Sequence, residues 1–181
     1  MKPLAAAFLP PVLAMTAIVA ASNWLVQFPI NDLLTWGAIT YPFSFLVTDL
    51  TTRLQGPDRA RRVVGIGFAL AVALSFWLAT PRTALASGSA FLAGQLLDIR
   101  VFQRLRGGSW WRAPLVSSTM GSVLDTALFF SLAFAGTELP WVTLAIGDLG
   151  VKLLLAVLAL APFRAVIAWA LPYPLARRPA A

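Results

Sequence analysis

The chain contains neither cysteine nor histidine. The absence of cysteine excludes disulfides, thiol nucleophiles and thiolate metal sites, and the absence of histidine excludes imidazole general bases. An aspartyl pair or a serine nucleophile is left for an enzyme, but no catalytic signature accompanies either residue type. The composition therefore weighs against an enzyme, and it predicts no bound metal and no cofactor.

Charged residues are also scarce. They make up 12% of the 181 residues, whereas 59% are hydrophobic. A soluble domain is about a quarter charged and about half apolar, so this chain is predicted to be an integral membrane protein in contact with the lipid bilayer. The formal charge is +7, and arginines that flank membrane spans explain it better than a nucleic-acid partner does.

Long apolar runs recur along the chain. A bilayer-spanning helix needs about 20 mostly apolar residues, with a range of about 17–25. Such segments occupy residues 7–28, 37–53, 63–80, 83–105, 115–136 and 141–163, and turn-forming residues separate them. No linker is long enough to divide two domains, so the sequence predicts one transmembrane domain over residues 1–181, an all-α integral membrane protein built as a six-helix bundle.

Arginine positions predict the orientation of this bundle, because cytoplasmic loops carry an excess of Lys and Arg. The side opposite the termini has only Arg82, with the acidic residues Asp32 and Glu138. Six spans therefore place both termini in the cytoplasm. The residues on the cytoplasmic side are then Lys2, Arg53, Arg59, Arg61, Arg62, Arg104, Arg106, Arg112, Arg177 and Arg178.

A second interpretation of the N-terminus is a cleaved secretory signal. Lys2, the apolar run and the small residues of IVAAS (18–22) fit that pattern. Cleavage would leave five spans and break the alternation of charge. The apolar run also continues past the site to Phe28, so an uncleaved first helix is favoured.

Polar residues form a stripe on five of the six predicted helices. Ionisable groups at lipid depth cost roughly 2.5–3.5 kcal/mol on insertion scales, and they usually face a cavity or a partner. Segment 63–80 has only Ser75 in its interior and is expected to face lipid. Five converging stripes predict one lined cavity. The candidate substrate-binding residues are Asn23, Gln27, Thr48, Asp49, Gln95, Asp98, Ser122, Asp125, Asp148 and Lys152.

Some of these residues have a structural alternative. Asp49 and Arg53 are four apart, as are Asp148 and Lys152, so each can form an ion pair within one helix. A structural pair is favoured for Asp49 and Arg53, which lie near the cytoplasmic end. Asp125 lies near mid-span without a local cation, and this makes it the best single candidate for contact with a substrate or a proton.

The residue types in these stripes suit a flat, uncharged heterocycle. Carboxylates accept hydrogen bonds from ring N–H and amino groups, carboxamides both donate and accept, and aromatic rings stack. These properties match a guanine-like edge, although other polar small molecules fit the same residues. Trp24, Tyr41, Phe43 and Phe45 supply the nearby aromatic rings.

Several stretches resemble a known family. They are NWLVQFPI (23–30), LTWGAITYPFSFLVTDLTTRLQG (34–56), AFLAGQLLDIRVFQRLR (90–106), WWRAPLVSSTMGSVLDTALFFSLAF (110–134) and the Asp148…Lys152 pair. Together they resemble the queuosine precursor transporter family, also called the VUT or YhhQ family, over roughly residues 22–163. The resemblance implies a multi-pass importer of 7-cyano-7-deazaguanine, and perhaps of related deazaguanines, in the bacterial inner membrane.

The resemblance also implies six helices, similarity to the substrate-binding subunits of vitamin transporters, and action without an ATP-driven module. The polar positions of the family motifs correspond here to Asn23, Gln27, Asp49, Gln95, Asp98, Asp125, Asp148 and Lys152. Two positions depart from the expected pattern: Leu149 replaces an aromatic residue, and the segment at 80–87 is short. The alternative is a binding subunit that needs an energising partner, for another heterocycle or vitamin. The oligomeric state is left open.

Overall fold

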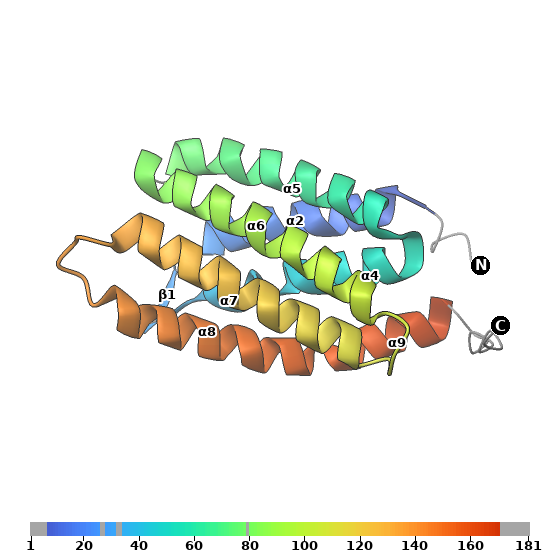
Figure 1. The fold of residues 1–181 in the computed structure, drawn as a ribbon. Coiled ribbons are helices and arrows are strands. Elements are labelled where there is room, and N and C mark those ends of the chain that lie inside the picture. Colours follow the sequence, from blue (N-terminus) through green and yellow to red (C-terminus); the bar gives the residue numbers. More distant parts are fainter. Residues whose placement is uncertain (1–6, 26–27, 32–33, 79, 171–181) are drawn as a thin grey trace.

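The computed structural model describes residues 7–25, 28–31, 34–78 and 80–170, and the described part is an all-α bundle (Figure 1). A short antiparallel hairpin, β1 with β2, follows the first helix. The elements in chain order are α2 (Leu9–Leu25), β1 (Pro29–Asn31), β2 (Leu34–Thr35), α3 (Trp36–Thr40), α4 (Phe43–Gln55), α5 (Pro57–Leu78), α6 (Pro81–Leu105), α7 (Arg112–Phe134), α8 (Trp141–Leu158) and α9 (Leu160–Ala170).

Two predicted helices are each divided in two. The segment expected as one helix over 37–53 is α3 and α4, which meet at Tyr41 and Pro42. The segment expected over 141–163 is α8 and α9, which meet at Ala159, and α9 runs on to Ala170. Proline has no N–H to continue the helical hydrogen-bond ladder, so Pro42 and Pro162 explain both interruptions.

The connections lie at two ends of the bundle. Figure 1 shows the start of α2, the α4–α5 and α6–α7 connections and the end of α9 at one end, and the α5–α6 and α7–α8 connections at the other. The first end is called the arginine-rich end here, because it carries Arg53, Arg59, Arg61, Arg62, Arg104, Arg106 and Arg112. Lys2, Asp32, Arg177 and Arg178 lie outside the described residues.

Arg82, at the opposite end, has a structural partner. Its guanidinium donates from Nε to the Leu132 carbonyl at 2.8 Å and from Nη2 to the Ala135 carbonyl at 2.6 Å. These carbonyls belong to the C-terminal turn of α7, where the helix dipole favours a cation. This arginine therefore ties the start of α6 to the end of α7.

An apolar cluster joins α2, α4, α5 and α6. It includes Met15, Val19, Val63, Phe91 and Ile99, all of them buried. Helix α5, which covers most of the segment 63–80 that was expected to face lipid, buries one of its sides in this cluster. Its other side carries Trp77, which is 88% exposed.

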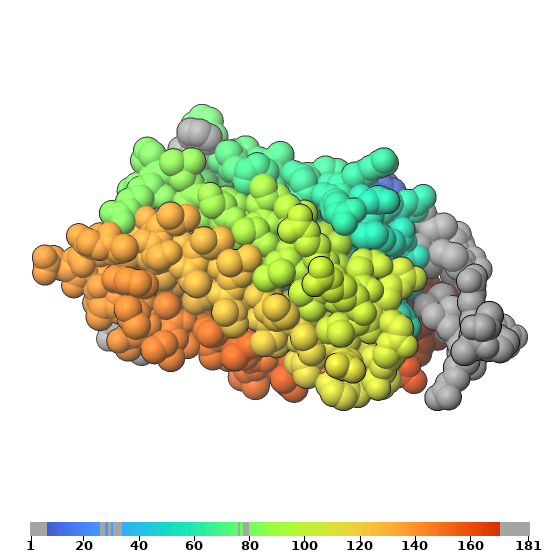
Figure 2. Space-filling model, in the orientation of Figure 1, coloured from blue at the N-terminus to red at the C-terminus, as the bar shows by residue number. Residues whose placement is uncertain are grey.

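The outer surface of the bundle is strongly apolar. The described helices that are long and apolar enough to cross a membrane, by length and composition alone, are Arg112–Phe134 and the run Trp141–Ala170 through α8 and α9. Within the most apolar 18-residue stretch of the second run, only 6% is buried inside the protein. Figure 2 shows side chains of α5, α6, α7 and α8 covering one face as neighbouring bands. Such extended exposed apolar surface is expected where lipid is the solvent.

Candidate functional site

The site begins at a close crossing of α6 and α7. A Cβ atom added to Gly94 would lie 3.0 Å from the Gly121 carbonyl oxygen, and one added to Gly121 would lie 3.0 Å from the Gly94 carbonyl oxygen. Glycine at both positions lets the two backbones touch, as small residues do in membrane helix pairs. The crossing sets Asp125 against Gly94 and Asp98 against Gly121.

A charged triad, defined as Asp125, Asp148 and Lys152, lies between α7 and α8. The Lys152 Nζ atom is 2.7 Å from Asp125 Oδ2 and 2.6 Å from Asp148 Oδ2. It also donates to Thr126 Oγ1 at 3.0 Å, and the Thr126 hydroxyl donates to Asp148 Oδ2 at 2.8 Å. The lysine is 4% exposed. Two carboxylates thus share one buried ammonium group.

Tyr41 extends the triad to the junction of α3 and α4. Its hydroxyl donates to Asp125 Oδ1 at 2.7 Å, and Lys152 Nζ lies 5.4 Å from the centre of its ring. The rings of Phe45 and Phe91 meet the Tyr41 ring edge-on, with centroids 6.4 Å and 6.2 Å away. Aromatic surface and charge therefore lie side by side in the interior.

A second group, the amide layer, consists of Ser44, Thr48 and Gln95. The Thr48 hydroxyl donates to Gln95 Oε1 at 2.6 Å, and Gln95 Nε2 donates to Ser44 Oγ at 2.8 Å. All three side chains are fully buried. The layer joins α4 to α6, and it lies between the charged triad and the arginine-rich end because α4 runs toward that end.

A third group, the carboxylate pair, consists of Asp49 and Asp98. Asp49 accepts hydrogen bonds from the hydroxyls of Ser117 and Ser118, each at 2.9 Å. Asp98 lies beside these three residues and is completely buried. Neither of its carboxylate oxygens has a hydrogen-bond partner among the described residues. Asp49 directly follows Thr48 on α4, and Asp98 lies about one turn beyond Gln95 on α6, so the pair is closer to the arginine-rich end than the amide layer is.

The structure places seven of the ten candidate residues in these groups. Ser122 is buried on α7, between Ser118 and Asp125 in the sequence. Asn23 lies apart from the three groups in its described contacts, since its Nδ2 donates to the Val19 carbonyl of its own helix at 2.9 Å. Gln27 lies outside the described residues.

One expected pairing does not form, one residue without a local cation has a cation from another helix, and one expected pairing is confirmed. Asp49 does not pair with Arg53, whose Nη1 donates to the Arg106 carbonyl at 2.8 Å and so ties α4 to the end of α6. Asp125 is not without a cation, because Lys152 reaches it from α8. The expected pair of Asp148 and Lys152 forms as predicted.

Ser117 and Thr126 are site residues that the predicted stripe on segment 115–136 missed. That stripe followed Ser118, Ser122 and Asp125. Ser117 and Thr126 are the immediate neighbours of its two ends, and a wider stripe that took pairs of adjacent positions would have included them.

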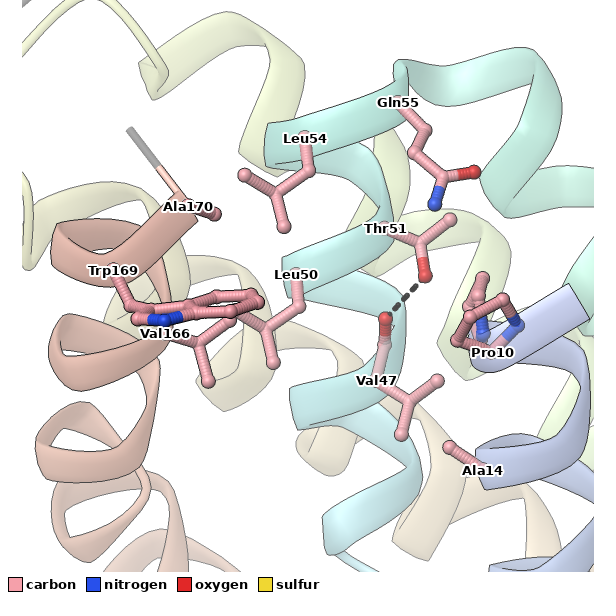
Figure 3. Close-up of a pocket in the computed structure, with 11 residues that line it drawn as sticks. Pro10, Ala14, Val47, Leu50, Thr51, Leu54, Gln55, Val166, Trp169 and Ala170 are labelled. Atoms are coloured by element: carbon pink, nitrogen blue, oxygen red, sulfur yellow. Dashed lines mark hydrogen bonds between the residues drawn. The ribbon is translucent and has the colours of Figure 1, made fainter. Parts of the chain in front are cut away.

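An apolar groove lies elsewhere, between α2, α4 and α9 (Figure 3). Its volume is about 190 Å³. Leu50, Leu54 and Trp169 point into it, and the Thr51 hydroxyl is occupied by the Val47 carbonyl at 2.6 Å. Apart from Thr51 and Gln55, whose Nε2 donates to the Ala7 carbonyl at 2.8 Å, its lining is apolar. No residue of the three polar groups lines it, so its surface suits a hydrocarbon chain rather than a polar heterocycle.

Comparisons with known proteins point in one direction. The sequence profile of the family described as "Putative vitamin uptake transporter" matches residues 35–80 and 75–167. A Haemophilus influenzae protein named "Probable queuosine precursor transporter" and an Escherichia coli K12 protein named "Queuosine precursor transporter" are each 35% identical to this chain, over 83% of it and 81% of their own length. A Bacillus subtilis protein named "Probable queuosine precursor transporter" is 27% identical over 56% of this chain and 57% of its own. No solved structure matches the chain.

Proposed function

The chain belongs to the queuosine precursor transporter family, and from this premise we propose that it imports 7-cyano-7-deazaguanine across the bacterial inner membrane. The observation that carries the proposal is 35% identity over 83% of the chain to a protein named for queuosine precursor transport. Polar groups buried inside an apolar helical bundle support it, because such groups mark substrate pathways in membrane proteins.

The proposed contacts follow from the chemistry of a deazaguanine. Asp125 and Asp148 accept from ring N–H and exocyclic amino groups, and Lys152 donates to the ring carbonyl. Gln95 has both a donor and an acceptor, and Tyr41 with Phe45 offers aromatic surface. In this structure the members of the charged triad bond to one another, as do those of the amide layer, so a bound heterocycle replaces those contacts. Thr48, Asp49, Asp98, Ser122, Asn23 and Gln27 complete the proposed path.

The proposed topology has six spans with both termini in the cytoplasm. Helices α3 and α4 together form one span, and α8 and α9 form another. This arrangement puts the arginine-rich end in the cytoplasm, as the positive-inside rule requires. Both the start of α2 and the end of α9 lie at that end (Figure 1), which supports an even number of crossings.

Rescue of queuosine in tRNA tests the proposed function. The host is a bacterium that lacks both its own synthesis of the precursor and its own importer. It is fed 7-cyano-7-deazaguanine at low concentration, and queuosine in tRNA is measured by boronate-gel mobility. We expect rescue by the wild type, and loss of rescue by Asp125→Asn at equal membrane expression.

Asp58→Asn is the matched control, because it makes the same chemical change at an exposed carboxylate on α5. Rescue by the control and not by Asp125→Asn would support the proposed site. A well-expressed wild type that fails to rescue would contradict an autonomous importer. Copurification with an ATP-driven module would then favour the alternative, a substrate-binding subunit that needs an energising partner.

A further inference from the structure

The carboxylate pair contains a fully buried acid that forms no ion pair among the described residues. Asp98 is 0% exposed, and both of its oxygens are without a hydrogen-bond partner among the described residues. Its neighbour Asp49 is 2% exposed and accepts from two serine hydroxyls. The hydroxyls of Ser117 and Ser118 beside Asp98 already donate to Asp49. A buried carboxylate without a neighbouring cation is costly, so this site suits a positively charged ligand.

Among the described residues, two cationic side chains are not exposed, Arg53 and Lys152, and both are held by other partners. On α4, Arg53 donates to the Arg106 carbonyl, and on α8, Lys152 is held by Asp125 and Asp148. The ion pair of Asp58 with Arg61 lies on the exposed side of α5. The remaining arginines around the pair are exposed: Arg59, Arg62, Arg100, Arg104, Arg106, Arg112 and Arg164.

A proton fits this pair of carboxyl groups better than a metal ion does. Asp49 already accepts two O–H donors, as an ionised carboxylate does. A proton on Asp98 makes that group neutral and turns it into a donor for a neighbouring oxygen. Two adjacent carboxyl groups that share one proton also avoid the repulsion of two like charges in a low-dielectric interior.

We propose that Asp49 and Asp98 together bind one exchangeable proton and that this proton is carried inward with the substrate. The proposal rests on the import function proposed above. In each cycle Asp98 takes up a proton as the site faces outward and releases the same proton to the cytoplasm. No bond to the substrate forms or breaks.

The amide layer connects this pair to the substrate groups. Thr48 is next to Asp49 on α4, and Gln95 is one turn from Asp98 on α6. The bonds between Thr48 and Gln95 therefore tie the two helices that carry the pair. A substrate that replaces those bonds changes the spacing of the two carboxyl groups and with it their proton affinity. By linkage, the proton changes substrate affinity by the same factor.

Transport into sealed vesicles tests this coupling. The full chain is reconstituted in vesicles of phosphatidylethanolamine and phosphatidylglycerol and supplied with labelled 7-cyano-7-deazaguanine. For one proton per substrate, an inside-alkaline gradient of one pH unit should give about ten-fold accumulation, which a protonophore abolishes. Asp98→Asn should lose gradient-driven accumulation, because an amide mimics the protonated acid and cannot release a proton.

Asp58→Asn is again the matched control, and it should accumulate substrate like the wild type. Accumulation driven by a sodium gradient instead, or equal uptake with and without the pH gradient, would overturn proton coupling while leaving import intact. Accumulation retained in Asp98→Asn would overturn the assignment to this pair. No exchange by the wild type would overturn the import function itself.

A direct measurement avoids dependence on any variant. Substrate added to the wild-type protein in weakly buffered detergent solution should shift the signal of a pH indicator, as the affinity of the pair for its proton changes. If binding occurs without any proton uptake or release between pH 5 and 9, a range chosen to span the shifts open to a buried carboxyl group, the proposal is refuted.

Discussion

Replacement of Lys152 by methionine tests how burial, at a fixed distance between the charges, changes the contribution of an ion pair to stability. Lys152 lies 2.7 Å from Asp125, and Arg61 lies 2.7 Å from Asp58. The first pair is about 5% exposed on both sides, whereas the side chains of Arg61 and Asp58 are 48% and 84% exposed. The two pairs therefore match in length and in charge and differ in their surroundings.

The expected magnitudes are far apart. Lys152→Met leaves the buried Asp125 and the half-buried Asp148 without their cation, and loss of one partner of a buried pair costs about 3–5 kcal/mol of the free energy of unfolding. Arg61→Met breaks a solvent-exposed pair and should cost about 0–1 kcal/mol. Adding Asp125→Asn and Asp148→Asn to Lys152→Met should recover much of the loss, because it removes the uncompensated charge.

The measurement is reversible unfolding in mixed micelles, followed by the fluorescence of the seven tryptophans. The difference in unfolding free energy between each variant and the wild type gives the cost directly. If Lys152→Met costs no more than Arg61→Met, the triad is not held by charge compensation. If the triple variant is less stable than Lys152→Met alone, unpaired carboxylates are not the cause of the loss.

Three further predictions use other parts of the structure. Gly121→Ala forces a Cβ against the facing helix and should lower the free energy of unfolding by about 1–3 kcal/mol. Gly147→Ala is the control, because the space around its Cβ position is open, and it should cause no such loss. The same unfolding titration measures both variants. Tyr41→Phe removes a hydroxyl donor from a buried carboxylate and should cost about 1–3 kcal/mol, and no loss would show that water or another donor replaces it. The chain has no cysteine, so Asp58→Cys and Glu138→Cys give single labels. A membrane-impermeant maleimide should label the second in intact cells and the first only after permeabilisation, and the reverse would invert the topology.

The sequence could predict which side chains face inward but not which of them meet. A stripe at helical spacing identifies one face of one helix, and this was enough to select Thr48, Gln95 and Asp125. Within a helix, partners are fixed by spacing, so the ion pair of Asp148 with Lys152 was predictable and is confirmed.

Contacts between side chains of different helices depend on which helices pack together and on how far one helix is shifted along the other. Asp125 and Lys152 are 27 positions apart, and nothing in their spacing indicates their contact. Their meeting depends on the packing of α7 against α8, which no single-helix pattern contains. For Arg53 the error runs the other way, because the four-residue spacing from Asp49 predicted a pair that does not form. The Asp49 carboxylate instead accepts from two serines of α7, and the Arg53 guanidinium donates to the Arg106 carbonyl at the end of α6.

The contact between Gly94 and Gly121 limits which parts of the bundle can move. Backbones that touch cannot slide or separate without loss of close packing, so α6 and α7 should behave as one rigid element. Relative motion then falls to α4 on one side and α8 on the other. Side-chain hydrogen bonds hold both interfaces: Thr48 with Gln95 joins α4 to α6, and Lys152 with Asp125 joins α8 to α7. A ligand can replace a side-chain hydrogen bond, but it cannot replace a backbone contact between two glycines. We therefore expect a substrate to separate α4 from α6 or α8 from α7, the two interfaces that carry polar residues, and not α6 from α7.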